Sequence, residues 1–480
     1  MYRILSVALL SFGLFACQSN EATNEEAQQI KPTAGVGDPQ LEYQAYNPQP
    51  SDLVISRAAY ADQLHGFWLG QCIANWTGLI TEMDKIGGEG KDGKAAGFYT
   101  SADWGGPDQP NMWDDSFNDT LSPTITFLFE KEGGLWGADD DTDIEYIYQY
   151  ITHQNKTTKL SPEQIRDGWL THIYKEGESP FIGADGKKGE NYLWVSNQTT
   201  HDLMQQGMLP PATSAPENNP NYEMIDAQLT TEIFGFYAPS RPDIALEIAE
   251  LPIQTTARFN AQWAAEFYVI MYALASVPKE GLSVKEKLLW MAETARQRLP
   301  ADSYSAKMYD FVKEQHVAGV SWEEARDALH QKYQVEQADG YQWATKDPVC
   351  NGCFAAGINF GASIVSLLYG EGDIKETIKI GALAGWDSDN PTATWGGLLG
   401  FMLGKEGLEK AFGQRFSNTF NIHRTRGGFP NNGIDTFENM AQVGLFIVDR
   451  MVQERMKGGI DLDKNIWYIP QDKWMIPAGS

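Results

Sequence analysis

Two acidic clusters, far apart in the sequence, place the strongest constraint on how this chain folds. The first, residues 139–143, reads Asp-Asp-Asp-Thr-Asp, and the second, residues 387–390, reads Asp-Ser-Asp-Asn. Each cluster precedes a run with helical periodicity, so its carboxylates lie at a helix N-terminus, where negative charge is favoured. Several carboxylates repel one another when they are buried together. A fold that buries them needs a cation, and carboxylate oxygens suit Mg²⁺, Ca²⁺ or Mn²⁺.

A simpler interpretation is that both clusters are acid-rich caps of surface helices. Asn390 is a favourable N-cap residue and Pro391 a favourable first helical residue. The apolar neighbours indicate burial instead, because Trp386 precedes the second cluster and Leu398 and Leu399 follow it. We therefore predict that the two clusters meet in space and share divalent cations, with surface caps as the alternative.

Length and charge narrow the class of protein. The chain has 480 residues, of which 42% are hydrophobic, and it can therefore bury a large core. Its formal net charge of -27 at pH 7 makes its surface repel phosphate backbones and anionic membrane faces. A nucleic-acid-binding function is not expected.

The N-terminus has the pattern of a targeting signal. Arg3 supplies a positive charge, and residues 4–15 form an apolar stretch shorter than a transmembrane helix. Residues 14–17, Leu-Phe-Ala-Cys, are similar to the lipobox of bacterial lipoproteins, in which the cysteine is lipidated and becomes the new N-terminus. We expect residues 1–16 to be a signal peptide and Cys17 to anchor the protein in the cell envelope, on a bacterial membrane facing the periplasm or the exterior. The alternative is an ordinary secretion signal with an incidental cysteine.

Helical periodicity dominates the rest of the chain, and alternating β patterns are scarce. We predict an all-α fold, with a flexible tether over residues 17–55, one large orthogonal helical domain over 56–460 and an extended tail over 461–480. Residues 176–222 are expected to be loop-like. Helices are expected at residues 58–82, 120–130, 144–153, 161–174, 227–237, 242–250, 261–276, 284–298, 303–316, 322–332, 353–368, 374–384, 392–403 and 440–456.

Few cysteines remain after the N-terminal signal. Cys72 lies in an apolar helical pattern and is expected in the core. Cys350 and Cys353 form a lone C-x-x-C, and a zinc site would need further Cys or His ligands that the sequence does not supply as a second pair. A structural pair, oxidised or reduced, is expected, with a redox centre as the alternative.

Three motifs, taken in order, resemble the ADP-ribosylglycohydrolase family, which includes the glycohydrolase that reactivates dinitrogenase reductase. The family opens with a G-x-x-x-G helix followed by a glutamate, as in residues 66–70 and Glu82 here. Its [ST]-D-D-T motif is matched by residues 139–142. Its G-G-D-T-D-T motif, followed by small residues and G-x-L-x-G, is matched by residues 385–390 and 396–400. The resemblance spans roughly residues 57 to 450.

This resemblance implies an all-α fold that binds two Mg²⁺ ions, or sometimes Mn²⁺. The implied metal ligands are Asp139, Asp140, Asp141, Asp387, Asp389 and Asn390. Three positions depart from the family pattern: Ala74-Asn75 replaces a Gly-Asp pair, Asp139 replaces Ser or Thr, and Asn390 replaces Thr. The amide oxygen of Asn390 can still bind a hard cation.

The resemblance implies a metal-dependent hydrolase that cleaves an N- or O-glycosidic bond of an ADP-ribosyl or related glycosyl substrate. Glu82 and Asp387 are the predicted catalytic residues, with Glu82 moving a proton to the leaving group or from water. Trp386 is predicted to stack on the substrate, with a core position as the alternative. Arg424 and Arg426 are predicted to bind a phosphate, with salt bridges to neighbouring acids as the alternative.

Two other functions stay open at this point. A non-enzymatic lipoprotein that binds glycans or nucleotides would share the signal, the tether and the aromatic content. The second alternative is a protein that keeps the fold and the metal ions but has lost catalysis. Under all three functions, the hydrolase and its two alternatives, the protein takes a small-molecule or glycosylated ligand and binds no nucleic acid. It reaches the membrane only through the lipid anchor. Titration with divalent cations separates the simple binder from the metalloprotein.

Overall fold

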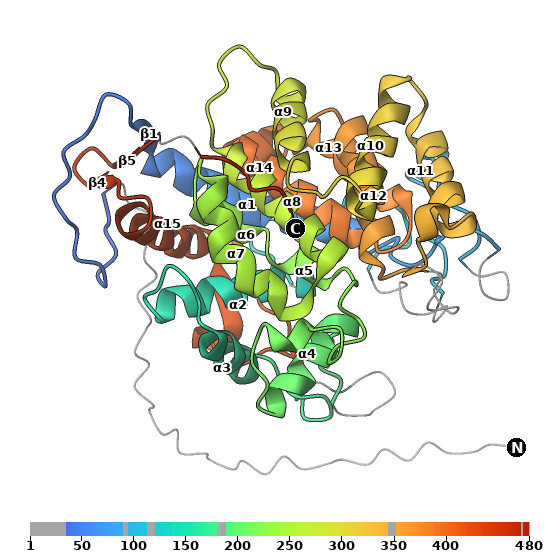
Figure 1. Cartoon of the computed structure of the whole chain (residues 1–480), viewed down its shortest axis with the longest axis horizontal. Coiled ribbons are helices and arrows are strands. Elements are labelled where there is room, and N and C mark those ends of the chain that lie inside the picture. Colours follow the sequence, from blue (N-terminus) through green and yellow to red (C-terminus); the bar gives the residue numbers. More distant parts are fainter. Residues whose placement is uncertain are drawn as a thin grey trace, which may run out of the picture.

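The helix α1, Arg57–Gly78, is the central element of the fold (Figure 1). Ser56 caps it, because its side-chain oxygen accepts a hydrogen bond from the Ala59 N–H. Most of its residues are buried, as expected for a helix enclosed by other helices. The computed structural model describes residues 35–89, 95–112, 121–137, 139–180, 182, 189–343, 352–471 and 474–479.

The helix α14, Asp389–Phe412, lies against α1 at very short range. A Cβ placed on Gly66 would come within 2.3 Å of the Gly400 carbonyl oxygen, and one on Gly70 within 2.4 Å of the Gly396 carbonyl oxygen. The glycines therefore allow the two backbones to touch. This contact brings the start of α14 to the end of α1.

Replacing Gly70 with alanine is expected to destabilise the protein by about 1–3 kcal/mol, because the new methyl group must push α14 away. Urea unfolding followed by circular dichroism measures this loss. Gly407→Ala is the matched control, since Gly407 is a half-buried glycine of α14, and its Cβ would approach only the Leu403 side chain, at 3.0 Å. Equal stabilities of the two variants would contradict the packing argument.

The other helices surround this pair. They are α2 (Asp140–Gln154), α3 (Pro162–His172), α4 (Val195–Gln205), α5 (Asp226–Thr230), α6 (Ile233–Tyr237), α7 (Pro242–Thr256), α8 (Phe259–Ala275), α9 (Val284–Arg296), α10 (Tyr304–Val317), α11 (Trp322–His330), α12 (Ala356–Tyr369), α13 (Ile374–Ala384) and α15 (Phe437–Glu454). Short helical turns are η1 (Ser101–Asp103), η2 (Ala212–Ser214), η3 (Gln331–Val335), η4 (Ala338–Gly340) and η6 (Pro430–Gly433). The predicted all-α domain is confirmed.

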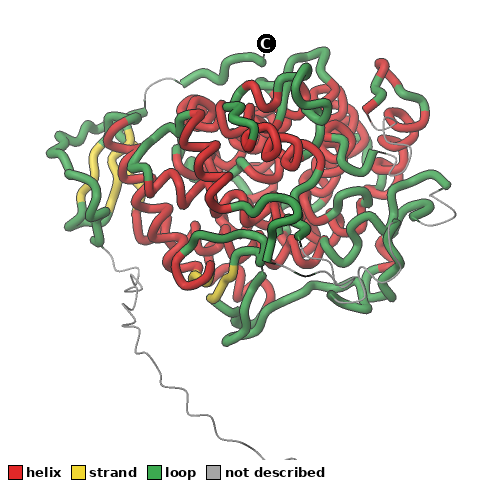
Figure 2. Tube along the Cα trace, turned by 90° about the horizontal axis from the view of Figure 1, so that it is seen from below, coloured by secondary structure: helices red, strands yellow, loops and turns green. Residues whose placement is uncertain are grey.

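A small antiparallel sheet joins the two ends of the described chain (Figure 2). Its strand order is β1 (Leu53–Ser56), β5 (Ile466–Ile469) and β4 (Gly459–Asp461), with Leu53 opposite Ile469. A second pair joins β2 (Thr419–Asn421) to β3 (Ile434–Thr436). The domain limits near residues 55 and 461 stay predictions, but β1 and β5 attach parts of the expected tether and tail to the helical body.

Some predicted helices differ from the observed ones. Residues 121–130 are not helical: Pro123 disfavours a helix before it, and Ile125, Phe127 and Phe129 alternate as in an extended segment. Phe127 and Phe129 pack their rings against Phe412 at centroid distances of 5.3 Å each. The expected helix at 227–237 consists of two short helices, α5 and α6.

Helix α4 lies inside the stretch that was expected to be a loop. Its sequence is polar, so it carries little apolar periodicity. Buried polar contacts hold it instead: the Asn197 N–H donates to Asp226 Oδ1 at 2.7 Å, and Ser196 Oγ donates to the Thr256 carbonyl. Such partners are distant in sequence and leave no local pattern.

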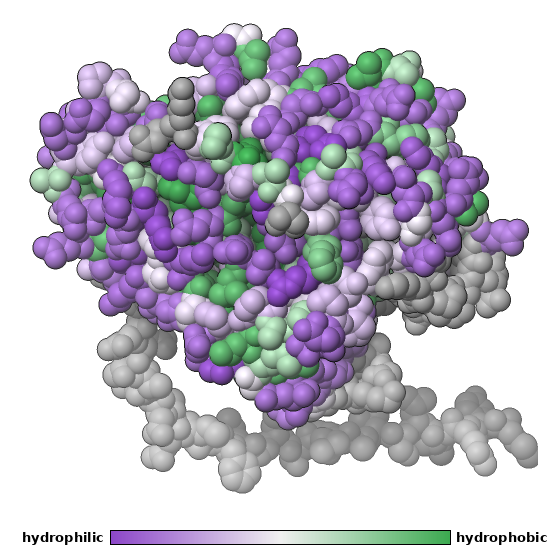
Figure 3. Space-filling view, in the orientation of Figure 1, coloured by the Kyte–Doolittle hydropathy of each residue, from purple (hydrophilic) through white to green (hydrophobic). Residues whose placement is uncertain are grey.

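The face of the molecule shown in Figure 3 is largely hydrophilic, with small scattered hydrophobic areas. In the part of the chain that the structure describes, no helix combines the length and the hydropathy needed to cross a membrane. Cys17 and the expected signal peptide lie outside the described residues.

Candidate metal centre

The two acidic clusters meet at the C-terminal end of α1. The amide of Asn75, near that end, faces carboxylates from both clusters. Its Nδ2 lies 3.5 Å from Asp139 Oδ2 and 3.2 Å from Asp141 Oδ2, both at the start of α2. The same nitrogen lies 3.3 Å from Asp389 Oδ2, at the start of α14. Two segments that are remote in sequence from each other and from α1 therefore converge on the side chain of Asn75.

Asn390 makes a second connection between the clusters. Its Nδ2 donates to Asp141 Oδ1 at 3.1 Å, so Asp141 receives an amide on each carboxylate oxygen. Its Oδ1 accepts a weak hydrogen bond, at 3.5 Å, from Gln228 Nε2 of α5. Asp141 and Asn390 are both buried, at 2% and 0% exposure. The clusters are thus interior features, and the surface-cap interpretation is wrong.

The carboxylates form two groups, each compact enough to hold a cation. One oxygen each from Glu82, Asp387 and Asp389 lie within 4.8 Å of one another. The second group contains one oxygen from each of Asp139, Asp140 and Asp141, and these oxygens also lie within 4.8 Å of one another. Glu82 is half-buried, whereas Asp387 and Asp389 are buried. The geometry is that of two adjacent oxygen-rich sites.

Burial and mutual repulsion control the protonation of these groups. Burial, followed by the charges of Asp389 and Glu82, raises the pKa of Asp387 well above its usual range. Burial, followed by the charges of Asp389 and Asp139, does the same for the pKa of Asp141. The pKa of Asp389 rises to about 6, through burial and then Asp139. Without a cation, burial and mutual repulsion therefore favour protonation of these carboxylates, and a divalent cation would compete with the protons.

Backbone hydrogen bonds place Glu82 beside the second cluster. The Met83 N–H donates to the Trp386 carbonyl at 3.0 Å, and the Trp386 N–H donates to the Lys85 carbonyl at 3.1 Å. Gly385 has φ +98°, and a Cβ there would lie 2.5 Å from the Lys85 carbonyl oxygen, so the turn requires glycine. The segment after α1 and the segment before α14 are thus locked side by side.

Comparison with known proteins identifies the family. The family model described as ADP-ribosylglycohydrolase matches residues 56–442 of this chain. The chain belongs to the ADP-ribosylglycohydrolase family. Among solved structures, one titled "ADP-ribosylglycohydrolase-related protein complex" is similar at 15% sequence identity and a TM-score of 0.39, covering 82% of this chain and 98% of that chain. A search of curated proteins gave no match.

Membership of the ADP-ribosylglycohydrolase family supports hydrolysis of a glycosidic bond at the level of the family. It also agrees with the all-helical fold and with the order of the three sequence motifs. In this member Asn75, which stands where the family pattern has an acid, bridges both clusters. The predicted roles of Glu82, Asp387 and the six metal ligands stay predictions, although the structure brings all of these residues together.

Two of the predicted substrate-binding residues have structural positions instead. Trp386 is 0% exposed, its Nε1 donates to Gln334 Oε1 at 2.9 Å, and its ring packs on Phe98. The structure therefore assigns it to the core rather than to a surface that stacks on a substrate.

Asn351 and Cys350 lie outside the described residues, and Cys353 is disulfide-bonded.

Arg426 is likewise engaged within the protein. Its Nε lies 2.9 Å from Asp143 Oδ2, and its Nη1 donates to the Asn191 carbonyl at 2.6 Å. Its side chain is 1% exposed, so the guanidinium is not free to receive a phosphate, and the salt-bridge alternative holds. Arg424 is exposed and lies over the ring of Tyr192 at 5.5 Å, and its phosphate-binding role stays a prediction.

Two polar residues that support the centre were missed from the sequence. Asn359 of α12 accepts a hydrogen bond from the Asp387 N–H at 3.3 Å and donates to the Cys353 carbonyl at 2.7 Å. Gln228 reaches Asn390 from α5. Both are single amides without a local motif, and only the folded chain places them near the acids.

The helix that carries Gln228 begins with a buried acid whose ionisation should limit stability. Burial raises the pKa of Asp226 from 3.8 to about 7, although its Oδ1 accepts the Asn197 N–H. The pKa of Asp226 is higher in the folded protein than in the unfolded chain. The neutral carboxyl therefore costs the folded protein no stability below pH 3.8, and the free energy of unfolding falls as the pH rises from 3.8 towards 7. Asp226→Asn keeps the acceptor and removes the charge.

Relative to Asp226→Asn, the wild type is expected to lose up to about 1.4 kcal/mol of stability per pH unit between those two pKa values. The difference should then level off at higher pH. Urea unfolding of both proteins at several pH values measures it. A difference in stability that does not change with pH would show that Asp226 has an ordinary pKa.

Proposed function

We propose that this protein is a metal-dependent hydrolase that cleaves an N- or O-glycosidic bond of an ADP-ribosyl or related glycosyl substrate. The observation that carries the proposal is the convergence on Asn75 of carboxylates from both clusters, 3.2–3.5 Å from its Nδ2. Membership of the ADP-ribosylglycohydrolase family supplies the class of reaction.

The residues present fit divalent cations. All six proposed ligands offer carboxylate or amide oxygens, which Mg²⁺ and Mn²⁺ prefer. Asp389 Oδ1 is buried and has no hydrogen-bond partner among the described residues, so it is an acceptor that a cation would satisfy. When bound, two such ions would supply Lewis-acid polarisation of a water and of sugar hydroxyls.

Glu82 is the side chain best placed to transfer a proton. It is more exposed than Asp387 and Asp389, with which it shares a carboxylate group. Burial, followed by the charges of Asp389 and Asp139, raises its pKa well above the usual range, which favours the protonated carboxyl that a general acid needs. Glu82 can then protonate the leaving-group atom and afterwards accept a proton from the attacking water.

Asp387 is proposed to stabilise positive charge that develops on the sugar. It lies within 4.8 Å of Glu82, measured between carboxylate oxygens, and its backbone N–H is held by Asn359 Oδ1. A carboxylate fixed beside the reacting carbon lowers the energy of an oxocarbenium-like transition state. Asp387 is also a proposed metal ligand, because one of its oxygens lies in the group formed with Glu82 and Asp389.

The deciding experiment is a screen of ADP-ribosylated proteins, ADP-ribose conjugates and simpler glycosides, with Mg²⁺ or Mn²⁺ and after treatment with EDTA. Release of the sugar that disappears with EDTA and returns with metal supports the proposal. Full activity after metal removal would overturn the metal-dependent mechanism. Cation binding without turnover of any substrate would favour the non-catalytic alternative.

We also propose that Cys17 anchors the protein to the cell envelope, as the lipobox-like sequence indicates. Cys17→Ala should then move the protein from the membrane fraction to the soluble fraction. An unchanged distribution would favour a different mode of localisation.

A further inference from the structure

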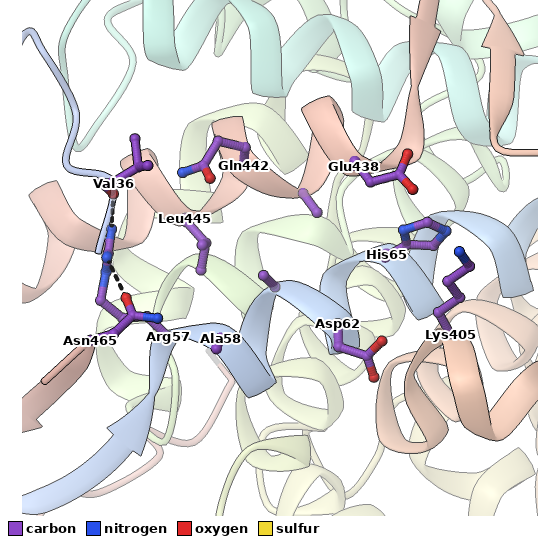
Figure 4. Close-up of a pocket in the computed structure, with 12 residues that line it drawn as sticks. Val36, Arg57, Ala58, Asp62, His65, Lys405, Glu438, Gln442, Leu445 and Asn465 are labelled. Carbon is purple, nitrogen blue, oxygen red and sulfur yellow. Dashed lines mark hydrogen bonds between the residues drawn. The ribbon is translucent and has the colours of Figure 1, made fainter. Parts of the chain in front are cut away.

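A recess of about 240 Å³ lies between the first half of α1 and α15 (Figure 4). Its arginine is already engaged, because the Arg57 guanidinium donates to Asn465 Oδ1 at 2.7 Å and to the Val36 carbonyl at 2.9 Å. Arg57 and Trp76 stand nineteen residues apart on α1, which is about 28 Å along the helix. The recess is therefore too far from the acids to hold the part of a substrate that lies next to them.

The surface next to the acids lies at the other end of α1. Between Leu64 and Asp84 only three residues are partly exposed, and these are Trp76, Leu79 and Glu82. Residues three apart lie on the same side of an α-helix and of the tighter 3₁₀ turn. The three side chains therefore form one accessible stripe, about 9–12 Å long for six residues of helical rise.

Hydrogen bonds continue the winding of the chain beyond the end of α1. The Leu79 N–H donates to the Asn75 carbonyl at 2.8 Å, and the Thr81 N–H donates to the Gly78 carbonyl at 3.0 Å. The backbone from α1 to Glu82 therefore turns as a helix does. This winding keeps the three members of the accessible stripe on one side.

The accessible stripe borders the metal centre along its length. Asn75, which precedes Trp76, has its Nδ2 at 3.2–3.5 Å from carboxylates of both clusters. Glu82, at the other end of the stripe, belongs to one of the two carboxylate groups. In the first cluster Asp139 and Asp140 are also partly exposed, whereas the second cluster is buried. A substrate therefore reaches the centre from the side that carries the stripe.

The ring of Trp76 lies beside the segment that leads into the first cluster. It packs against the ring of Trp136 at a centroid distance of 5.2 Å. A Cβ placed on the partly exposed Gly137 would lie 3.2 Å from Trp76 Cζ2. Trp76 is therefore an aromatic side chain with accessible surface next to the acids.

Trp76 differs from the buried tryptophans near it in the use of its indole N–H. Trp136, Trp386 and Trp395 are each 0% exposed, and each donates its indole N–H to a partner in the core. In the part of the chain that the structure describes, Trp76 Nε1 has no such hydrogen bond. The Trp76 ring is therefore held by packing on one side only, and its remaining surface is free to contact a ligand.

We propose that the accessible stripe binds the leaving group of the glycosidic substrate, and that this leaving group contains a ring that stacks on Trp76. The inference rests on the proposed function, in which Glu82 protonates the leaving-group atom. That atom must lie within hydrogen-bonding distance of Glu82, so the rest of the leaving group extends over Leu79 and Trp76. Hydrolysis breaks the bond between the sugar carbon and this atom, which takes the proton of Glu82, while the hydroxyl of water joins the sugar.

The shape of the indole defines the chemical class of the leaving group. A flat ring, either aromatic or the C–H face of a second sugar, covers an indole over a large area. A flexible chain, such as an amino-acid side chain of a modified protein, would leave Trp76 largely uncovered. The preferred substrates should therefore be glycosides with a ring next to the cleaved bond.

The first test compares ethyl and benzyl glycosides of D-ribofuranose, D-glucopyranose and D-galactopyranose in the presence of Mg²⁺. The two leaving alcohols have similar acidity and differ mainly in the ring. The benzyl glycoside of the accepted sugar should have a kcat/KM about tenfold higher, chiefly through a lower KM. Trp76→Ala should bring this ratio close to one, and Trp76→Phe, which keeps a ring, should retain part of it.

Trp290→Ala is the matched control, because Trp290 is a partly exposed tryptophan of α9 whose ring packs under Lys279 Nζ at 3.8 Å. It should keep the full ratio. A ratio near one in the wild type, or a full ratio in Trp76→Ala, would overturn the proposal. Hydrolysis of protein-linked ADP-ribose without hydrolysis of any benzyl glycoside would also overturn it.

The second test does not depend on turnover. The full chain is labelled with 5-fluorotryptophan at its fifteen tryptophans, and the ¹⁹F signal of Trp76 is identified by its absence in Trp76→Phe. Benzyl alcohol should shift this signal saturably, and ethanol should not. The signal of Trp290 should stay in place. No saturable shift at Trp76, or an equal shift at Trp290, would overturn the proposal.

Together the two tests separate this inference from the proposed function. A saturable Trp76 shift in a protein that hydrolyses no glycoside would support binding of a ring at Trp76 and count against the hydrolase. Metal-dependent hydrolysis without a ring preference and without a Trp76 shift would overturn this inference alone.

Discussion

Replacement of Glu82 by glutamine is expected to lower kcat by about 10²- to 10⁴-fold, the range typical of a lost proton-transfer group. The amide keeps the size of the side chain and one oxygen near Asp387 and Asp389, but it cannot give up or regain a proton. The measurement is steady-state hydrolysis, under saturating metal, of the substrate found in the screen. The pH dependence of kcat should lose the limb that reports the raised pKa of Glu82.

Glu89→Gln is the control for this variant, because Glu89 is an exposed acid shortly after Glu82 in the sequence. It should leave kcat unchanged. A loss of less than tenfold in Glu82→Gln would show that another group moves the proton. A loss accompanied by weaker cation binding would make Glu82 a metal ligand rather than the acid.

Replacement of Asp141 by asparagine is expected to abolish stabilisation by divalent cations. Asp141 receives the amides of Asn75 and Asn390 on its two oxygens and lies at the junction of the clusters. A cation at 100 times its dissociation constant stabilises a protein by about 2.7 kcal/mol, and this gain should disappear. Metal-free stability should fall only in part, because the asparagine keeps one oxygen that accepts an amide and loses the other.

Thermal unfolding with Mg²⁺ or with EDTA measures both quantities in one experiment. Asp167→Asn removes the same formal charge from the surface of α3, where Asp167 pairs with Arg166 at 2.6 Å, and it should keep the full Mg²⁺ effect. If Asp141→Asn also keeps that effect, Asp141 is not a ligand. If it unfolds without metal, the two amides rather than a cation hold the centre together.

The sequence predicted the acidic centre because its carboxylates are dense and lie at helix N-termini. Asp139 and Asp389 are separated by much of the chain, yet their apolar neighbours led us to predict that they are buried together, and their like charges led us to predict a cation between them. The glycines of the G-x-x-x-G helix, Gly66 and Gly70, lie where α1 meets α14. These signals are local, and the folded structure follows them.

Other features depend on contacts that no local pattern encodes. Trp386 precedes an acidic cluster, a position that favoured a stacking role, but its indole N–H donates a hydrogen bond to Gln334 in the core. Arg426 lies in a basic stretch, but its partner Asp143 belongs to a distant helix. Asn75 was visible only as a departure from a family pattern, and its bridging role appears when three segments are brought together.

The closeness of α1 to α14 also affects how the protein is made. During synthesis α1 leaves the ribosome long before α14 and before β5, the partner of β1. The apolar surface of α1 therefore stays exposed while the segments between α1 and α14 are synthesised. Chains of this size with such distant contacts are prone to aggregation before completion. Newly made protein should thus depend on chaperones until α14 and β5 have emerged.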